Sequence, residues 1–216
     1  MHDGVREGRT VFGNIVKYIR MSTSSSFGNM LSVLGASIFL PFLPMAPVQV
    51  LFNNLLYDLS QIAVPTDRVD EEYLAQPRRW AAGNVMRYMF AIGPISSLFD
   101  GATFLVLLYG FGAWADPALF QSGWFVESLL SQSLIVHVLR TGRMPFVQSK
   151  SSLALAVMTL AVCAVGVALP YSAVAGPLRL VPLPLGYWTA LTGILLGYLV
   201  ATQLAKRYIM QHIGLD

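Results

Sequence analysis

LALAVMTLAVCAVGVAL, residues 153–169, is the stretch that decides the class of fold. It contains no charged side chain, and its one hydroxyl belongs to Thr159. A helix needs roughly 20 mostly apolar residues to cross the hydrocarbon core of a bilayer, so this stretch has nearly the length of a membrane span. Ser152 precedes it and Pro170 follows it, as expected at the two ends of a helix. We therefore predict a transmembrane helix here.

Five further apolar stretches accompany it, at residues 27–43, 47–64, 86–111, 123–139 and 185–204. Hydrophobic residues make up 55% of the 216 residues and charged residues only 12%, whereas a soluble domain carries about 25% charged residues. Period-two alternation is absent, which argues against a β-barrel. We predict an all-α, polytopic membrane protein with six transmembrane helices within residues 27–208. Its partner is then the lipid bilayer, and we expect no nucleic acid.

The chain also has a long segment before the first predicted span and a short segment after the last one. Residues 5–21 place apolar side chains among charged ones with the period of an amphipathic helix. Such a helix either lies on the membrane surface or continues the first span into the cytosol as a stalk, and the pattern fits both. Residues 209–216 are expected to form a cytosolic tail.

The basic residues are distributed unevenly over the predicted loops. If both chain ends face the cytoplasm, thirteen of the fourteen lysines and arginines lie on that side and only Arg179 lies on the other. Cytoplasmic loops of membrane proteins carry such an excess of basic residues. We therefore predict that both termini are cytoplasmic.

Three carboxylates fall inside the predicted spans: Asp58, Asp100 and Glu127. A charge at mid-bilayer costs a few kcal/mol or more (about +2.5–3.5 on insertion scales), so each is a functional candidate. Asp58 lies in the densest polar segment, Asn53–Gln61, where Asn54 and Asp58 are one helical turn apart on the same face.

The preceding span offers Ser26 and Asn29, also about one turn apart. Across a helical hairpin, these oxygens and Asp58 would form a cage of one carboxylate and several neutral groups, which suits a hard cation such as Mg²⁺. The alternative is that Asn54 and Asp58 only form hydrogen bonds between packed helices.

The other two carboxylates allow more than one interpretation. Asp100 follows the Gly93-Pro94 pair, and a partner on a neighbouring helix is favoured over an ion ligand. Glu127 either completes the cation cage, carries a proton or pairs with another span. Several aromatic residues lie near span ends and are typical of aromatic belts at the membrane interface: Trp80, Trp114, Trp124, Tyr187 and Trp188.

Several of these segments resemble one known family. Residues 24–29 (SSSFGN), Pro47-Val48-Gln49 and residues 54–58 (NLLYD) resemble the fifth and sixth membrane helices of P-type cation pumps. Relative to calcium pumps, Ser26 replaces an asparagine and Asn29 a glutamate, so the site carries less negative charge. Further segments, including 76–80 (QPRRW) and 93–97 (GPISS), are similar to bacterial magnesium-importing P-type ATPases.

This resemblance implies a fold, a location and a site. The chain would form helices five to ten of a ten-helix transport domain in the bacterial inner (plasma) membrane. Residues 1–26 would be the cytosolic stalk that leads into the first span. Magnesium would be the transported ion, and its ligands would be Asp58, Asn54, Asn29, Ser26 and Glu127.

The catalytic motifs of the pumps are not found in these 216 residues. The D-K-T-G-T phosphorylation motif, the T-G-E motif and the G-D-G-x-N-D hinge are absent, and no Gly-rich phosphate loop replaces them. We therefore expect ATP to act only through other domains of the pump, in cis or in trans, and the chain alone not to be an ATPase. The alternative is an unpowered membrane channel, or a regulatory or assembly partner of a full-length pump.

Overall fold

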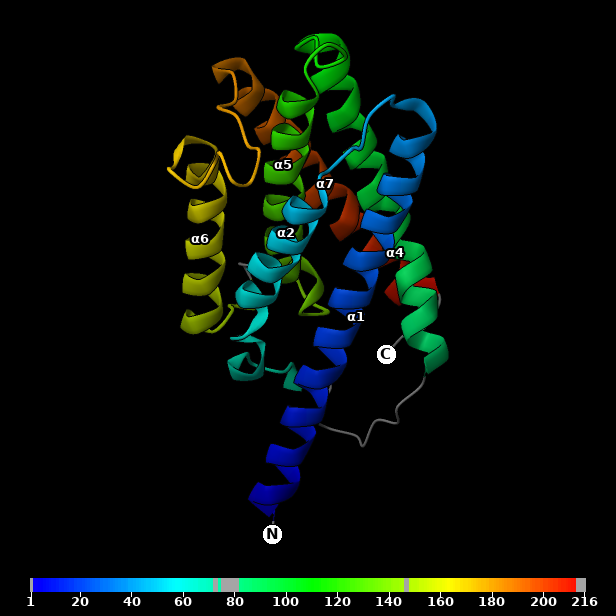
Figure 1. The fold of residues 1–216 in the computed structure, drawn as a ribbon. Coiled ribbons are helices and arrows are strands. Elements are labelled where there is room, and N and C mark those ends of the chain that lie inside the picture. The colour runs from blue at the N-terminus through cyan, green and yellow to red at the C-terminus, as the bar shows by residue number, and fades with distance from the viewer. Residues whose placement is uncertain (1, 72–73, 75–81, 146–147, 213–216) are drawn as a thin grey trace.

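The computed structural model describes residues 2–71, 74, 82–145 and 148–212, and they form a bundle of helices without a strand in this part of the chain (Figure 1). The described part of the chain holds six long helices and three single turns of 3₁₀ or π helix. The long helices are α1 (His2–Phe39), α2 (Pro47–Gln61), α4 (Ala82–Leu105), α5 (Pro117–Leu139), α6 (Leu153–Ala168) and α7 (Leu185–His212). The turns are η1 (Val64–Thr66), η2 (Val106–Gly110) and η3 (Leu169–Tyr171).

The all-α prediction is confirmed for the described residues, and three helical segments are long and apolar enough to cross a membrane. They are Ala82–Gly110, Leu153–Tyr171 and Leu185–Gln211. Each of the other three long helices is either too short or not apolar enough to meet both conditions. α2 has only 15 residues, and α5 carries Glu127, Gln132 and His137 on a helix that is buried along most of its length. A helix surrounded by other helices can hold polar groups that a lipid-facing helix cannot.

Two predicted boundaries differ in the structure. α1 is unbroken from His2 to Phe39, so the stalk runs straight into the first span, which ends at Phe39 and not at the predicted residue 43. It extends beyond the bundle toward the N terminus (Figure 1). α7 continues past residue 204 to His212, which makes the start of the predicted tail helical, while residues 213–216 lie outside the described part.

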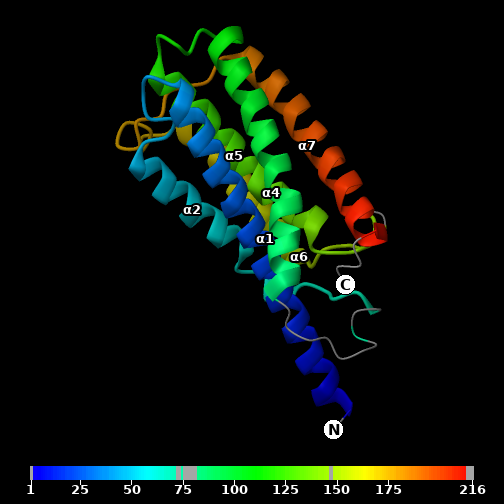
Figure 2. The same ribbon diagram turned by 90° about the vertical axis from the view of Figure 1, so that its right-hand side faces the viewer.

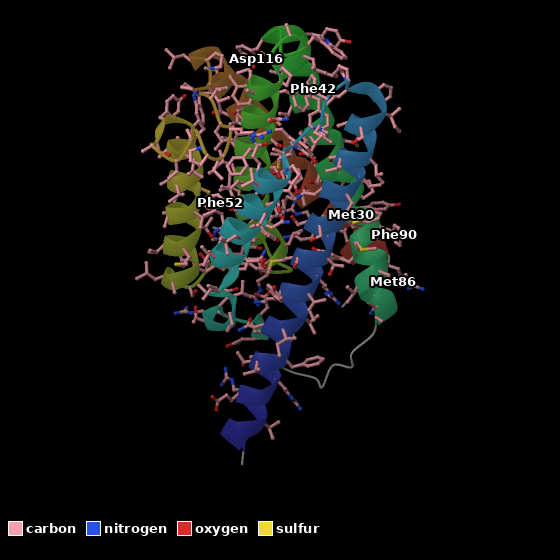
Figure 3. The ribbon with its side chains drawn as sticks, viewed as in Figure 1. Met30, Phe42, Phe52, Met86, Phe90 and Asp116 are labelled. Atoms are coloured by element: carbon pink, nitrogen blue, oxygen red, sulfur yellow. The ribbon has the colours of Figure 1, made fainter. Side chains whose placement is uncertain are left out.

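Proline and side-chain caps set the limits of the central helices. Pro47 and Pro117 stand in the first turns of α2 and α5, where a missing backbone N–H leaves no bond unmade. The carboxylate of Asp116 accepts from the Leu119 N–H at 3.1 Å, and the Ser152 hydroxyl accepts from the Leu155 N–H at 3.1 Å. Asp116 lies at the end of the bundle opposite the N terminus (Figure 3).

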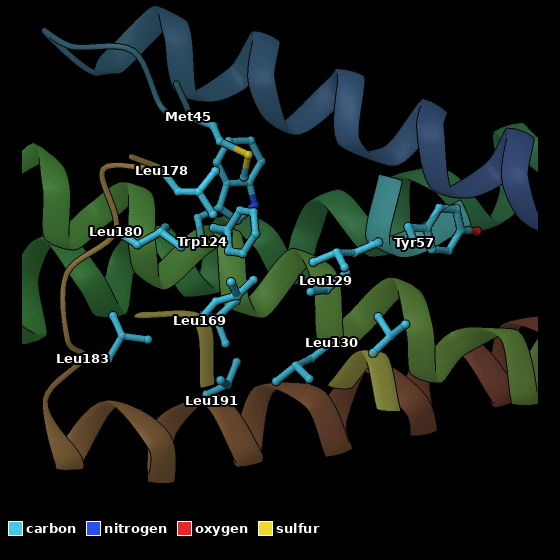
Figure 4. Close-up of a cluster of buried hydrophobic side chains, with 14 of the residues drawn as sticks. Met45, Tyr57, Trp124, Leu129, Leu130, Leu169, Leu178, Leu180, Leu183 and Leu191 are labelled. Atoms are coloured by element: carbon cyan, nitrogen blue, oxygen red, sulfur yellow. The ribbon is translucent and has the colours of Figure 1, made fainter. Parts of the chain in front are cut away.

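α5 is the centre of the bundle, and it packs against α1, α2, α4, α6 and α7. Figure 2 shows α2 on one side of the bundle and α7 on the other, with α1 and α4 between them. Its aromatic side chains fill the interior: Phe120, Trp124 and Phe125 are at most 1% exposed. In Figure 4 Trp124 lies between Met45 and Leu178 above it and Leu169 below. The prediction that Trp124 belongs to an interfacial belt is therefore wrong, and so is the same prediction for Tyr187, which is 0% exposed.

α1 and α4 approach closely where two glycines meet. A methyl group added to Gly28 would lie 2.9 Å from the Gly93 carbonyl oxygen and 2.9 Å from Cβ of Ser96. One added to Gly93 would lie 2.6 Å from the Phe27 ring. Small residues at such crossings let helix backbones pack tightly within membranes.

We expect the Gly28→Ala substitution to destabilise the protein by about 1–3 kcal/mol, because the backbone of α4 has to move away from the new methyl group. The measurement is thermal unfolding of the purified protein in detergent micelles. Gly35→Ala is the matched control, since it lies on the same helix with no atom within 4 Å of the added methyl group. The control should be neutral or slightly stabilising. Equal melting temperatures for the two variants would contradict the close crossing.

A buried ionic cluster fastens the N-terminal half of α1 to the bundle. Asp67, 3% exposed in the loop after η1, accepts from Arg140 Nη1 at 3.2 Å through both oxygens and from Lys17 Nζ at 3.3 Å. The Ser152 N–H donates to the same carboxylate at 3.1 Å. Burial lowers the pKa of Lys17, while Asp67 opposes that shift. Because Lys17 is on α1 and Arg140 ends α5, Asp67 links the two helices.

Candidate cation-binding site

α2 carries its polar side chains on two faces. Gln49, Asn53, Tyr57 and Gln61 follow one another at four-residue intervals and are all buried against the bundle. Asn54 and Asp58 are exposed on the other side, among exposed leucines. The predicted segment therefore divides into an inner row that holds α2 in place and an outer pair that is open to a ligand.

The inner row is joined to neighbouring segments by hydrogen bonds. The Gln49 amide donates to the Leu178 carbonyl at 2.9 Å, and its oxygen accepts from the Ala46 N–H at 2.9 Å. The Asn53 amide donates to the Phe125 carbonyl at 3.0 Å. These bonds satisfy amide groups that would be costly to bury unpaired, and they fix the rotation of α2 about its axis.

A second polar contact ties α1 to this arrangement. The Gln132 amide donates to Ser128 Oγ at 2.6 Å and to Asn53 Oδ1 at 3.4 Å, and Gln132 Oε1 accepts from Ser25 Oγ at 3.0 Å. One glutamine of α5 thus contacts α1 and α2 together. The sequence alone gives no partner for Gln132, because the facing residues are distant in the chain.

Between α1 and α2 lies an open cavity of about 370 Å³. Its polar lining comes from Ser26 and Asn29 of α1, Asn53 and Asn54 of α2, and Ser128 of α5. The structure thus brings together three of the five predicted ligands: Ser26, Asn29 and Asn54. Neither Ser26, Asn29 nor Asn54 makes a side-chain hydrogen bond within the described part of the chain, so their oxygens are available to a bound ion or water.

Asp58 lies one turn further along α2, about 6 Å along the helix axis. It lines a second cavity of about 510 Å³, with Asn14, Tyr18 and Gln61 among its neighbours. No hydrogen bond or ion pair to Asp58 is found among the described residues. A carboxylate without a partner on a helix with leucines on either side is a strong candidate for cation binding.

Glu127 lines neither of these two cavities. It is 1% exposed on α5, and Asp100 of α4 is also 1% exposed. Asp100 accepts from Trp124 Nε1 at 3.1 Å and from the Ser32 hydroxyl. Asp100 therefore has partners on two neighbouring helices, α5 and α1, as predicted.

The set of oxygens along the α1–α2 groove, Ser26, Asn29, Asn54 and Asp58, has a definite chemistry. One carboxylate with two amides and a hydroxyl is a hard-oxygen donor set of low charge, and Mg²⁺ is bound by proteins in this manner with several of its waters retained. No cluster of three or more histidine, cysteine, aspartate or glutamate side chains that would suit a transition metal occurs among the described residues.

The comparisons with known proteins agree with the resemblance drawn from the sequence. Residues 42–208 match the family described as "Cation transporting ATPase, C-terminus". The chain is 51% identical over 216 residues to a protein of Salmonella typhimurium and to one of Escherichia coli K12, both called "Magnesium-transporting ATPase, P-type 1". Each alignment covers 99% of this chain and 24% of the relative.

A "Calcium-transporting ATPase" of Bacillus subtilis is more distantly similar, at 33% identity over 76 residues, or 35% of this chain and 8% of that protein. The chain thus spans about a quarter of the length of the magnesium-transporting relatives that it matches.

Proposed function

Because this chain belongs to the cation-transporting ATPase C-terminal family, we propose that it forms the membrane half-site of an ATP-driven magnesium importer. The relatives that match 99% of the chain are magnesium-transporting ATPases, which supports magnesium as the ion. In this proposal, ATP is used by other domains of the pump, and the 216 residues supply part of the path for the ion.

The observation that carries the proposal is the unpartnered oxygen set of the α1–α2 groove. Asp58 supplies the one negative charge, and Asn54, Asn29 and Ser26 supply neutral oxygens. The ligands are spread along about one helical turn, so a hydrated ion contacts Asp58 and the amides in part through its own water molecules. Glu127, buried on α5 directly before Ser128 of the cavity lining, is the fifth proposed ligand.

One side of the groove is open and bordered by exposed apolar side chains. Met30, Leu34 and Leu51 around it are exposed, and all are more than half accessible. We propose that helices from the rest of the pump, in cis or in trans, cover these apolar side chains and complete the coordination of the ion. Removal of this apolar surface from water and lipid then accompanies assembly of the site.

The test is magnesium uptake by bacterial cells that lack their own magnesium importers. We expect growth at low magnesium when the chain is joined to the N-terminal three quarters of the Escherichia coli relative, and none when the chain is expressed alone. Uptake by the chain alone would point instead to an unpowered channel. Failure of the joined protein, together with inhibition of a co-expressed intact pump, would point to a regulatory partner.

We further propose that all six long helices cross the bacterial inner membrane, with both termini in the cytoplasm. The loops after η2 and η3 are then on the far side, at the end of the bundle where Asp116 lies (Figure 3). The unequal distribution of lysine and arginine supports this orientation.

A single cysteine placed at Ser172, in a variant with Cys163 replaced by alanine, is expected to react with a membrane-impermeant maleimide added to intact cells. A cysteine at Ser151 should react only after the cells are opened. The measurement is the fraction of protein labelled before and after permeabilisation. The reverse pattern would show that the orientation is inverted, and labelling of both positions in intact cells would show that fewer helices cross the membrane.

A further inference from the structure

We propose that the cavity beside Asp58 is a second cation site, in which Asn14 of α1 and Gln61 of α2 hold a hydrated divalent cation next to the Asp58 carboxylate. This cavity has a volume of about 510 Å³ and is lined by all three residues. The inference deepens the proposed function, because Asp58 is shared with the α1–α2 groove. Asn14 and Gln61 do not belong to the groove, so the two sites can be tested separately.

Gln61 is the last residue of α2 and lies about one turn after Asp58, on the same side of the helix. It is only 2% exposed, yet neither its amide oxygen nor its amide nitrogen makes a hydrogen bond with the described residues. An amide buried without a partner destabilises the folded protein. A hydrated ion in the cavity would supply the missing partner.

Asn14 lines the same cavity from α1, and its amide has a fixed orientation. Its nitrogen donates to the carbonyls of Pro65 and Asp67, both at 3.0 Å. Only the NH₂ group of an amide can pair with two carbonyl oxygens. The amide oxygen, which is buried and has no donor among the described residues, is therefore an acceptor in a fixed position.

The charges around the cavity favour a cation. Asp58 is the one charged side chain among the described residues that line it. Lys17 of α1 is directed to the Asp67 carboxylate at 3.3 Å and to the Arg68 carbonyl at 2.7 Å. α2 has no basic residue in its last turn, so the partial negative charge of the helix end is not neutralised there. The rest of the lining is mostly apolar, and such walls strengthen the field of the carboxylate: Val11, Ile15, Ile62, Val64 and Pro65.

The size of the cavity favours a hydrated ion over a bare one. Mg²⁺ takes six oxygen ligands at about 2.0–2.1 Å, and three side-chain oxygens cannot complete that shell. Six water molecules occupy roughly 180 Å³ at about 30 Å³ each, which fits within the cavity. The carboxylate and the two amide oxygens then accept hydrogen bonds from waters bound to the ion.

The second site lies on the cytoplasmic side of the groove in the proposed orientation. Along α2, Gln61 follows Asn54 and Asp58, and along α1, Asn14 precedes Ser26 and Asn29. Both helices thus place the second site beyond the same end of the groove. Asp58 stands between the two positions, so an ion that leaves the groove can keep its contact with this carboxylate as it enters the second site.

Relaxation of nitroxide labels by Mn²⁺ alone tests the proposal with the protein in lipid nanodiscs. Mn²⁺ has the charge of Mg²⁺ and also takes oxygen ligands. Single cysteines replace Gly8 or Gly35 of α1, in a variant with Cys163 replaced by alanine. An added Cβ meets no atom within 4 Å at either glycine. Along α1, the second site is about 10 Å from Gly8 and about 30 Å from Gly35, and the groove is about 30 Å and about 10 Å from them.

We expect Mn²⁺ below one equivalent to speed relaxation of the label at Gly8, and excess Mg²⁺ to reverse the effect. Gln61→Leu should weaken this binding by at least roughly 10-fold, and Gln61→Glu, which adds a second carboxylate, should strengthen it. Asn29→Leu is the control and should leave the titration at Gly8 unchanged.

The two labels distinguish the second site from the groove. A response at Gly35 alone, or equal Mn²⁺ affinity at Gly8 in the unmodified protein and in Gln61→Leu, would overturn the second site and leave the proposed function standing. A response at Gly8 alone would support the second site and count against ion binding in the groove.

Thermal unfolding gives a second readout if Gln61→Glu does not fold. Without divalent cations, Gln61→Leu should melt no lower than the unmodified protein, because it removes two buried polar atoms that lack partners. Added Mg²⁺ should raise the melting temperature of the unmodified protein more than that of Gln61→Leu, since an ion that binds only the folded state stabilises it. Equal shifts in the two proteins would contradict the proposal.

Discussion

Replacing Asp58 with asparagine is expected to abolish magnesium uptake by the joined pump, with a loss of at least roughly 10- to 100-fold, the range found when metal sites are perturbed. The amide keeps the shape of the side chain and removes its charge, so the substitution separates ion binding from packing. Folding should be nearly unchanged, because Asp58 is exposed and has no hydrogen-bond partner among the described residues. The measurement is the initial rate of magnesium uptake, normalised to the amount of protein in the membrane.

Asp116→Asn is the matched control for this experiment. Asp116 lies at the other end of the bundle and caps α5, and asparagine caps a helix about as well as aspartate. The control should therefore transport at the normal rate. If Asp58→Asn retains normal magnesium dependence while Glu127→Gln or Asp100→Asn loses it, the ion is bound between α4 and α5, and the groove has another role.

The largest effect on stability is expected for Asp67→Ala, at about 3–5 kcal/mol. The substitution leaves the guanidinium of Arg140 buried without its counter-ion and removes the acceptor of Lys17 and of the Ser152 N–H. The measurement is reversible unfolding in mixed micelles. Glu7→Ala, on the exposed start of α1, is the control and should change stability by less than about 0.5 kcal/mol.

A double variant checks the cause of that loss. In Asp67→Ala combined with Arg140→Met, the uncompensated guanidinium is gone, so the double variant should be more stable than Asp67→Ala alone. If the two substitutions add instead, the ion pair is not what Asp67 contributes, and the backbone bonds of its loop would account for the effect.

The helices were largely predictable because apolar length and proline positions determine them. The stretch at residues 153–169 became α6 within one residue, and Pro47 begins α2 as expected. The extent of α1 was not predictable in the same way. An amphipathic leader fits both a surface helix and a stalk, and only the contacts of Lys17 with the loop at Asp67 distinguish the two.

The candidate site was predictable in its residue types and only partly in its geometry. Helical spacing placed Asn54 and Asp58 on one face, and the structure exposes both. Spacing could not show that Gln61 turns inward or that Glu127 is buried, because these depend on the rotation of each helix against its neighbours. Trp124 was misassigned for the same reason: its position in sequence is near a predicted span end, while in space it is at the centre of the bundle.

The unbroken course of α1 has a mechanical consequence. Its 38 residues form a rod about 57 Å long that contains no proline and is held near Lys17 by the Asp67 cluster. Asn29 lies about 18 Å beyond that fulcrum, so a tilt of only 5° would displace it by about 1.6 Å. A force applied to the exposed end of the rod would thus reach the α1–α2 groove as a sideways shift, comparable to the difference between a direct ion contact and a water-mediated one.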